Sequence, residues 1–155
     1  MSIVFVTGNI LEDESEALVN PVNTVGIMGK GLALAFKERF PEMFKDYVAA
    51  CQRKAVTIGE MHCFRAIDHF TEKNERWIVN FPTKIHWRDR SNIKYIRYGL
   101  IDLVQALKDI DVKSVAIPPL GCGCGGLQWF EVKDLITEAF KDSEIAVTIY
   151  CQEQF

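Results

Sequence analysis

The chain has 155 residues, of which 48% are hydrophobic and 25% charged, which suits one domain with a substantial core. Its formal net charge of −3 gives no overall attraction for nucleic acid, so any such binding has to come from a local patch. No segment resembles a signal peptide or a membrane span, and the five scattered cysteines do not resemble a secreted disulfide framework. We therefore expect a single domain over residues 1–155, cytoplasmic, with reduced thiols and no membrane association.

Apolar runs at residues 3–6 and 17–20 predict two short buried strands. Helical spacing of apolar residues follows Gly29, and Pro41 divides that region into two helices, at a position where a first helical turn tolerates proline. The runs at residues 59–64 and 77–81 predict two more strands, which we expect to form a hairpin around the polar turn 71–75.

The clearest predicted helix follows Ser91, a favourable N-cap residue, because Ile93, Ile96 and Leu100 begin an apolar stripe that continues to Leu107. Residues 114–118 then predict a strand, residues 132–140 a helix and residues 146–150 a last strand. Strand and helix alternate almost throughout. The sequence therefore predicts an α/β fold with helices on both faces of a parallel or mixed sheet.

Two glycine-rich turns, at residues 20–31 (NPVNTVGIMGKG) and 121–126 (GCGCGG), each follow a predicted strand and precede a predicted helix. Backbone without Cβ atoms at a helix N-terminus suits a diphosphate ligand. The first turn lacks the Ser or Thr with which a Walker loop holds magnesium, which disfavours NTP hydrolysis. The second turn matches G-x-G-x-x-G, but too little chain follows it for a dinucleotide-binding domain. Two interpretations of the second turn remain: a phosphate-binding loop, or a turn that binds no ligand.

Several side chains near these turns have both a functional and a structural interpretation. The amide of Asn23 suits the vicinal hydroxyls of a ribose, and it equally suits an Asx bond within its own turn. Cys122 and Cys124 have no second pair of Cys or His at a spacing that completes a metal site, so we expect no metal. The three histidines, His62, His69 and His86, are scattered and receive no role.

The segment 84–98 carries five Lys or Arg residues and one Asp, interleaved with Trp87, Tyr95 and Tyr98. Cations for phosphates and flat rings for unstacked bases are what a single-stranded nucleic-acid track requires. A solvated helix face with its aromatic rings in the core explains the pattern equally well. Lys84 follows the predicted strand 77–81, where the carboxyl edge of a sheet would place it among the glycine turns. The ordinary alternative is a surface lysine.

Three segments together, ALVNPVNTVGIMGKGLA (17–33), NFPTK (80–84) and IPPLGCG (117–123), resemble the macro domain family in its lysine-dependent ADP-ribosyl glycohydrolase branch. The resemblance covers essentially the whole chain. It implies a three-layer α/β/α sandwich with a mixed central sheet. It also implies that ADP-ribose is the ligand, and we expect no cofactor.

Carried over residue by residue, the resemblance makes Lys84 the catalytic residue. It places adenine beside residues 8–10, the distal ribose around Asn23 and residues 29–31, and the diphosphate along residues 121–125. The complete predicted ADP-ribose set is Gly8, Asn9, Ile10, Asn23, Thr24, Val25, Gly29, Lys30, Gly31, Leu120, Gly121, Cys122, Gly123, Cys124 and Gly125. The expected DNA contacts are Trp87, Arg88 and Arg90. Asn9 stands where macro domains usually have Asp, and Gly125 stands where a related lysine-using type has a partner aspartate.

The resemblance implies an enzyme that hydrolyses the bond between a nucleobase nitrogen and C1 of the distal ribose, as antitoxin members of this branch do on DNA. Lys84 would act either as a nucleophile, when neutral, or as an acid or orienting group, when charged. A non-catalytic ADP-ribose reader, or a hydrolase of protein-linked or acylated ADP-ribose, would use the same pocket. We expect a monomer whose partners are ADP-ribose, ADP-ribosylated DNA and a cognate ADP-ribosyltransferase toxin.

Overall fold

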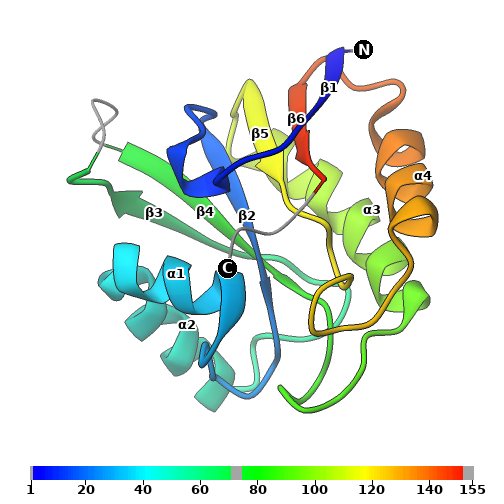
Figure 1. The fold of residues 1–155 in the computed structure, drawn as a ribbon. Coiled ribbons are helices and arrows are strands. Elements are labelled where there is room, and N and C mark those ends of the chain that lie inside the picture. Colours follow the sequence, from blue (N-terminus) through cyan, green and yellow to red (C-terminus); the bar gives the residue numbers. More distant parts are fainter. Residues whose placement is uncertain (1, 71–74, 152–155) are drawn as a thin grey trace.

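The computed structural model describes residues 2–70 and 75–151, which build one six-stranded sheet in the order β1-β6-β5-β2-β4-β3 (Figure 1). All neighbouring strands are parallel except β3 and β4, which are antiparallel. The strands are β1 (Ser2–Val6), β2 (Ala17–Val22), β3 (His62–Ile67), β4 (Glu75–Pro82), β5 (Ser114–Ile117) and β6 (Ala146–Tyr150). The predicted mixed sheet is confirmed.

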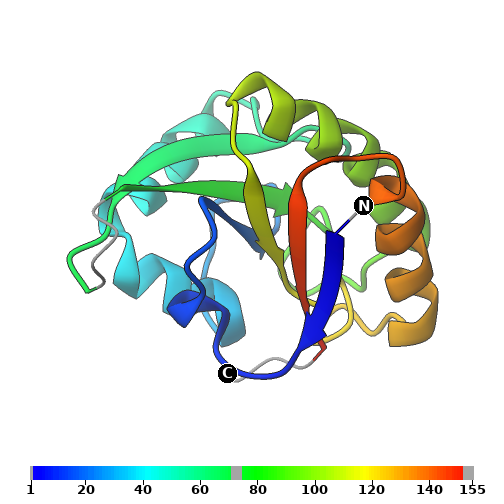
Figure 2. The ribbon, with the colours of Figure 1, turned by 90° about the horizontal axis from the view of Figure 1, so that it is seen from above.

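Helices cover both faces of this sheet, which confirms the predicted three-layer α/β/α sandwich (Figures 1 and 2). The helices are α1 (Gly31–Arg39), α2 (Pro41–Gln52), α3 (Ile93–Asp109) and α4 (Trp129–Phe140), with a short 3-10 helix η1 (Ile10–Glu12) after β1. Helices α1 and α2 pack on one face and α3 and α4 on the other. Among the described residues, no helix is long and apolar enough to cross a membrane.

Because side chains alternate along the central strands, these strands contribute residues to the hydrophobic core on each face of the sheet. In β2, Ala17 and Val19 pack toward α3 and α4, whereas Leu18 packs toward α1 and α2. A strand buried on both faces needs apolar residues at consecutive positions, which explains the unbroken run Ala17–Val19 in the sequence. All three residues are fully buried.

Gly99 allows α3 to approach the sheet closely. A Cβ atom at this position would lie 2.3 Å from the ring of Phe81 in β4, well inside the contact distance of two carbon atoms. Glycine in a helix interior costs about 1 kcal/mol relative to alanine. The buried Phe81 ring, which is fully covered, occupies the space that this glycine leaves.

Two expected boundaries differ from the structure. The strand predicted at residues 59–64 begins only at His62, because Gly59 adopts φ +87° in the preceding turn. The N-cap of α3 is Asn92, whose Oδ1 accepts from Lys94 N, so the prediction of Ser91 is wrong by one residue. Ser91 N instead donates to Gly125 O at 3.0 Å. Pro41 is the first residue of α2, as predicted.

The predicted hairpin of β3 and β4 is confirmed by the register His62↔Asn80 to Ile67↔Glu75. Residues 71–74 of its expected turn lie outside the described residues. Because β1, β2, β4, β5 and β6 run in the same direction, their carboxyl ends share one edge of the sheet. The loops after β2, β4 and β5 meet at that edge.

Candidate active site

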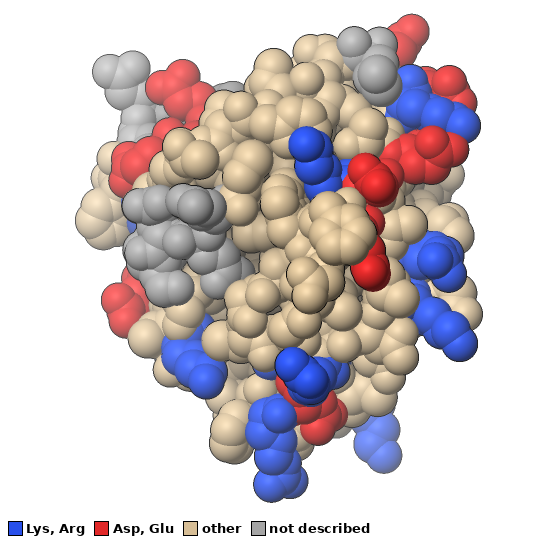
Figure 3. All heavy atoms as spheres, turned by 45° about the vertical axis from the view of Figure 1, so that its right-hand side comes forward, with Lys and Arg blue, Asp and Glu red and all other residues tan. Residues whose placement is uncertain are grey.

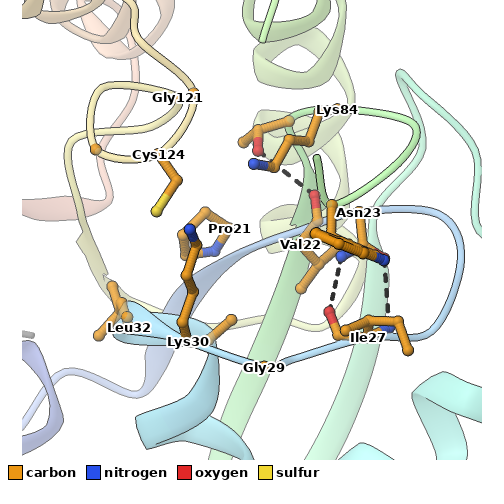
Figure 4. Close-up of a pocket in the computed structure, with 16 residues that line it drawn as sticks. Pro21, Val22, Asn23, Ile27, Gly29, Lys30, Leu32, Lys84, Gly121 and Cys124 are labelled. Carbon is orange, nitrogen blue, oxygen red and sulfur yellow. Dashed lines mark hydrogen bonds between the residues drawn. The ribbon is translucent and has the colours of Figure 1, made fainter. Parts of the chain in front are cut away.

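A cavity of about 350 Å³ lies where the loops after β2, β4 and β5 meet (Figure 4). Its floor is formed by the end of β2 and the start of α1, and its walls by the two glycine turns and the loop that carries Lys84. The lining residues are Pro21, Val22, Asn23, Ile27, Gly29, Lys30, Gly31, Leu32, Ala33, Thr83, Lys84, Trp87, Gly121, Gly123, Cys124 and Gly125.

The structure thus brings ten of the predicted site residues to one cavity. These are Asn23, Gly29, Lys30, Gly31, Lys84, Trp87, Gly121, Gly123, Cys124 and Gly125. The other predicted residues, Gly8, Asn9, Ile10, Thr24, Val25, Leu120, Cys122, Arg88 and Arg90, do not line it. Both glycine turns and Lys84 therefore converge, as the carboxyl-edge argument predicts.

Asn23 holds the first glycine turn in shape. Its Oδ1 accepts from the backbone N–H of Val25 at 3.0 Å, and its Nδ2 donates to Ile27 O at 2.7 Å. The hydroxyl of Tyr47 also donates to Asn23 Oδ1, at 2.9 Å. The Asx-type interpretation of Asn23 is therefore present in the structure. One amide hydrogen of Nδ2 is left over for a ligand in the cavity, because the bond to Ile27 uses the other.

Tyr47 is a support for this turn that sequence reasoning missed. It is fully buried in α2, and burial raises the pKa of its hydroxyl well above the ordinary value, so the group stays protonated and can donate. In the sequence Tyr47 is one member of the apolar stripe of α2. Its spacing indicated only burial, and nothing in it indicated a hydrogen bond to Asn23.

The loop of Lys84 is tied to the first glycine turn by backbone bonds. Thr83 N donates to Val22 O at 2.9 Å, and both the N–H and the hydroxyl of Thr24 donate to Ile85 O at 2.9 Å. Thr24 therefore braces the site from outside the cavity. Lys84 itself, half-buried, is held between these two anchor points.

The second glycine turn closes tightly on Ser91. A Cβ at Gly125 would lie 2.3 Å from Ser91 Oγ and 2.4 Å from Gly121 O. Ser91 Oγ is buried and has no hydrogen-bond partner among the described residues. Any side chain at position 125, an aspartate included, would require this turn to move. The packing of the turn therefore matches the absence of the related enzymes' partner acid.

The described lining of the cavity consists largely of glycine backbone and apolar side chains, and its charged side chains are lysines. Lys30 and Lys84 both line it, whereas none of its described lining residues is Asp or Glu. In Figure 4, the Lys30 side chain extends from the first turn toward Cys124 of the second, and Lys84 lies across the cavity from Leu32. Two lysines beside glycine backbone favour an anionic ligand such as a diphosphate.

The residues expected at the adenine lie on the loop after β1. Asn9 caps η1, with its Oδ1 accepting from Leu11 N at 3.0 Å, and Ile10 is buried at 3% exposure. Gly8 has φ +135° and lies beside the ring of Tyr150. This loop is thus fixed by its own capping bond, separate from the cavity lining.

The remaining predicted residues lie around the cavity. Val25 is exposed and Leu120 is fully buried. Arg88 and Arg90 are exposed, and a Cβ at Gly126 would lie 3.1 Å from the Arg90 guanidinium, so this arginine covers the second glycine turn. Figure 3 shows Lys and Arg side chains at the lower end of the molecule, the end where the loop after β4 lies in Figure 1.

No group of three or more His, Cys, Asp or Glu residues within 2–70 and 75–151 is placed to hold a metal ion. Cys124 is exposed in the cavity, and the Sγ of Cys122 points back toward Leu120 O at 3.5 Å. His62 is the first residue of β3, and its side chain lies between Asp46 and Asn80, with which it makes bonds of 2.8 and 2.9 Å.

The comparison with known proteins matches residues 19–136 of this chain to the family described as Macro domain. A protein of Mycobacterium tuberculosis named DNA ADP-ribosyl glycohydrolase is 46% identical over 149 residues, covering 96% of this chain and 42% of that protein. A protein of the same name from Thermus aquaticus is 50% identical over 147 residues, covering 94% of this chain and 40% of its own length. The chain therefore spans about two fifths of these relatives.

Solved structures agree with this result. The macrodomain of Mycobacterium tuberculosis DarG superposes with a TM-score of 0.90 at 46% identity, covering 96% of each chain. Thermosipho africanus DarTG in complex with ADP-ribose superposes with a TM-score of 0.89 at 36% identity, covering 96% of this chain and 41% of that one.

Proposed function

This chain belongs to the macro domain family, and from that premise we propose that it is a hydrolase that removes ADP-ribose from nucleobases of single-stranded DNA. The observation that carries the proposal is the meeting of Lys84 and both glycine turns in one cavity without a carboxylate among its described lining residues. The names of the relatives at 46% and 50% identity support the same reaction.

We assign the diphosphate of ADP-ribose to the backbone of the second glycine turn, with the distal ribose toward Asn23 and the first turn. Both turns line the cavity with glycine, at positions 29, 31, 121, 123 and 125. Backbone N–H groups bind phosphate oxygens without a desolvated countercharge. Lys30 adds a positive charge from the first turn.

Lys84 then lies at the reacting end of the ligand, for which two routes remain in the proposal. A neutral amine could attack C1 of the ribose and displace the base, which takes up a proton as its bond to C1 breaks; the ring of the lysine adduct then opens to an imine that water hydrolyses to free ADP-ribose and lysine. A charged amine could instead donate its proton to the departing base. Reduction with borohydride separates the routes, because only an imine is trapped as a stable adduct on Lys84.

The DNA on either side of the modified base would run over the exposed arginines. Arg88 and Arg90 follow Lys84 within six residues and are exposed; Arg88 is next in sequence to the lining residue Trp87, and Arg90 lies against Gly126. Cations at this place can contact flanking phosphates while the ADP-ribose remains inside. This local patch offsets a net charge that would otherwise repel DNA.

We further propose that the protein works as a cytoplasmic monomer beside an ADP-ribosyltransferase toxin. The support for the toxin is a Thermosipho africanus relative, 35% identical, that is named a fusion of a DNA ADP-ribosyl transferase and a DNA ADP-ribosyl glycohydrolase. A transferase that modifies DNA produces the substrate that this site would consume.

The proposal is tested by incubating the protein with a single-stranded oligonucleotide that carries ADP-ribose on one base, and with ADP-ribose linked to a protein carboxylate. We expect release of ADP-ribose and return of the unmodified oligonucleotide. Binding of free ADP-ribose without release from either substrate would identify a reader. Release from the protein substrate alone would replace the proposed DNA activity with a protein-directed one.

A further inference from the structure

We propose that Trp87 forms a subsite for the leaving group, in which its indole ring stacks on the nucleobase that is cut from ADP-ribose. The subsite would select substrates whose leaving group is an aromatic base. This inference rests on the proposed function, because it takes Lys84 as the residue at the reacting bond.

Trp87 shares a loop and a cavity with Lys84, the residue proposed to act at the bond to the leaving group. Trp87 follows Lys84 by three residues on the same loop, and both line the same cavity. Among the described residues lining that cavity, Trp87 is the one aromatic side chain. For a group attached to the atom on which Lys84 acts, the indole is therefore the aromatic surface that the described lining offers. The glycine turns, by contrast, offer only backbone.

Hydrogen bonds fix the loop that carries Trp87, and a ring contact with His86 supports the indole. Ile85 O accepts two bonds from Thr24, and His86 N donates to Asp89 Oδ2 at 3.1 Å. The imidazole of His86 lies against the indole, with ring centroids 5.1 Å apart and planes inclined by 38°. Such a fixed ring loses little conformational freedom when a base stacks on it.

The exposure of Trp87 is the second observation. Its side chain is 48% exposed and lines the cavity. An indole half in water and half against His86 leaves apolar surface that a base can cover. A base offers the face of an aromatic ring for stacking, whereas a carboxylate or a hydroxyl leaving group contains no aromatic ring. The same ring thus favours a nucleobase over a protein side chain.

The subsite should be tolerant of base identity. Stacking uses the face that every base has, and hydrogen-bond readout would require polar groups at the base edges. The Oδ1 of Asn23, a polar lining residue, already accepts bonds from Val25 N and Tyr47, and its remaining amide hydrogen is assigned to the ribose. The exposed Arg88 next to Trp87 would contact the neighbouring phosphate. We therefore expect a flipped or single-stranded base to be recognised by stacking on Trp87 and by contacts to its neighbouring phosphates.

The test compares Trp87→Ala, Trp87→Leu and Trp87→Phe with the wild type on the ADP-ribosylated oligonucleotide. We expect Trp87→Ala and Trp87→Leu to lower kcat/KM by about 10- to 100-fold, the range of a lost base stack, and Trp87→Phe to restore most of it. Affinity for free ADP-ribose should stay within about threefold in all three, since it has no base at this position. Phe130→Ala is the matched control, because Phe130 is an exposed ring (64%) outside the cavity lining.

A second measurement uses binding alone, in the Lys84→Ala background. The modified oligonucleotide should quench tryptophan fluorescence there, and Trp87→Phe should remove that part of the quenching. Equal kcat/KM for wild type and Trp87→Ala would overturn the subsite while leaving the proposed function intact. Equal loss of free ADP-ribose affinity would also overturn it, by making Trp87 a wall of the ADP-ribose site. A wild type inactive on the oligonucleotide would overturn the proposed function, and the subsite with it.

Discussion

Replacing Gly125 by alanine tests whether the second glycine turn is a rigid wall of the cavity. The added Cβ would lie 2.4 Å from Gly121 O and 2.3 Å from Ser91 Oγ, against an ordinary contact of about 3.5 Å. A backbone carbonyl cannot rotate away as a side chain can. The turn itself therefore has to move, by about 1 Å if contact distances are to be restored.

The size of the effect follows from this displacement. Overpacking of a closed site costs about 1–3 kcal/mol of the free energy of unfolding. A shift of the turn also misplaces one or two N–H groups proposed to bind the diphosphate, and a hydrogen bond to a charged group contributes about 1.5–3 kcal/mol. We therefore expect Gly125→Ala to bind ADP-ribose about 10- to 100-fold more weakly.

Titration calorimetry with ADP-ribose, together with thermal unfolding, measures both quantities. Gly99→Ala is the matched control, because its Cβ would come equally close to another group, 2.3 Å from the Phe81 ring, but between α3 and β4. It should lose stability and keep ADP-ribose affinity within about threefold. Wild-type stability and affinity in Gly125→Ala would refute the rigid wall. Loss of stability alone would show that this turn does not bind the diphosphate.

Three further predictions concern individual side chains. Lys84→Ala should abolish release from DNA while free ADP-ribose binding stays within about tenfold; a parallel loss of binding would make Lys84 a recognition residue. Changing both Arg88 and Arg90 to Glu should weaken binding of the modified oligonucleotide far more than binding of ADP-ribose. The salt dependence of oligonucleotide affinity should also become shallower. Equal losses for both ligands would mean that the arginines shape the cavity. Cys124, exposed in the cavity, should be alkylated first at neutral pH and be protected by ADP-ribose. Cys63 should react slowly until the pH approaches its pKa, which burial raises to about 11. Mass spectrometry of alkylated peptides measures both thiols, and a Cys124 rate insensitive to ADP-ribose would place the ligand elsewhere.

Local patterns were sufficient for most of the fold. The unbroken apolar run Ala17–Val19 indicates a strand covered on both faces, and the stripe from Ile96 to Leu107 indicates the face of α3 that meets the sheet. Pro41 marks the start of α2 because proline fits a first helical turn. These signals are readable because each depends on neighbours within about one or two turns of the same element.

The candidate site was only partly readable in this way. The glycine turns and Lys84 could be found because each directly follows an apolar strand, and parallel strands end at a common edge. The two interpretations of Asn23 could not be separated, because the deciding partner, Tyr47, lies 24 residues away. The N-cap at Ser91 was wrong because Asn92 Oδ1 accepts from Lys94 N, whereas the Ser91 hydroxyl lies against Gly121 and Gly125 of another loop.

By itself, therefore, the sequence determined the alternation of strands and helices, the two flexible turns and the single lysine that follows β4. Tertiary structure alone decided that Gly125 has no room for an acid, because Ser91 and Gly121 fill the space around it. It also decided that the half-exposed Trp87 lines the cavity, with its indole in contact with the His86 ring. The physical reason is that periodicity reports which residues are buried, whereas the shape of a binding site depends on contacts between loops distant in sequence.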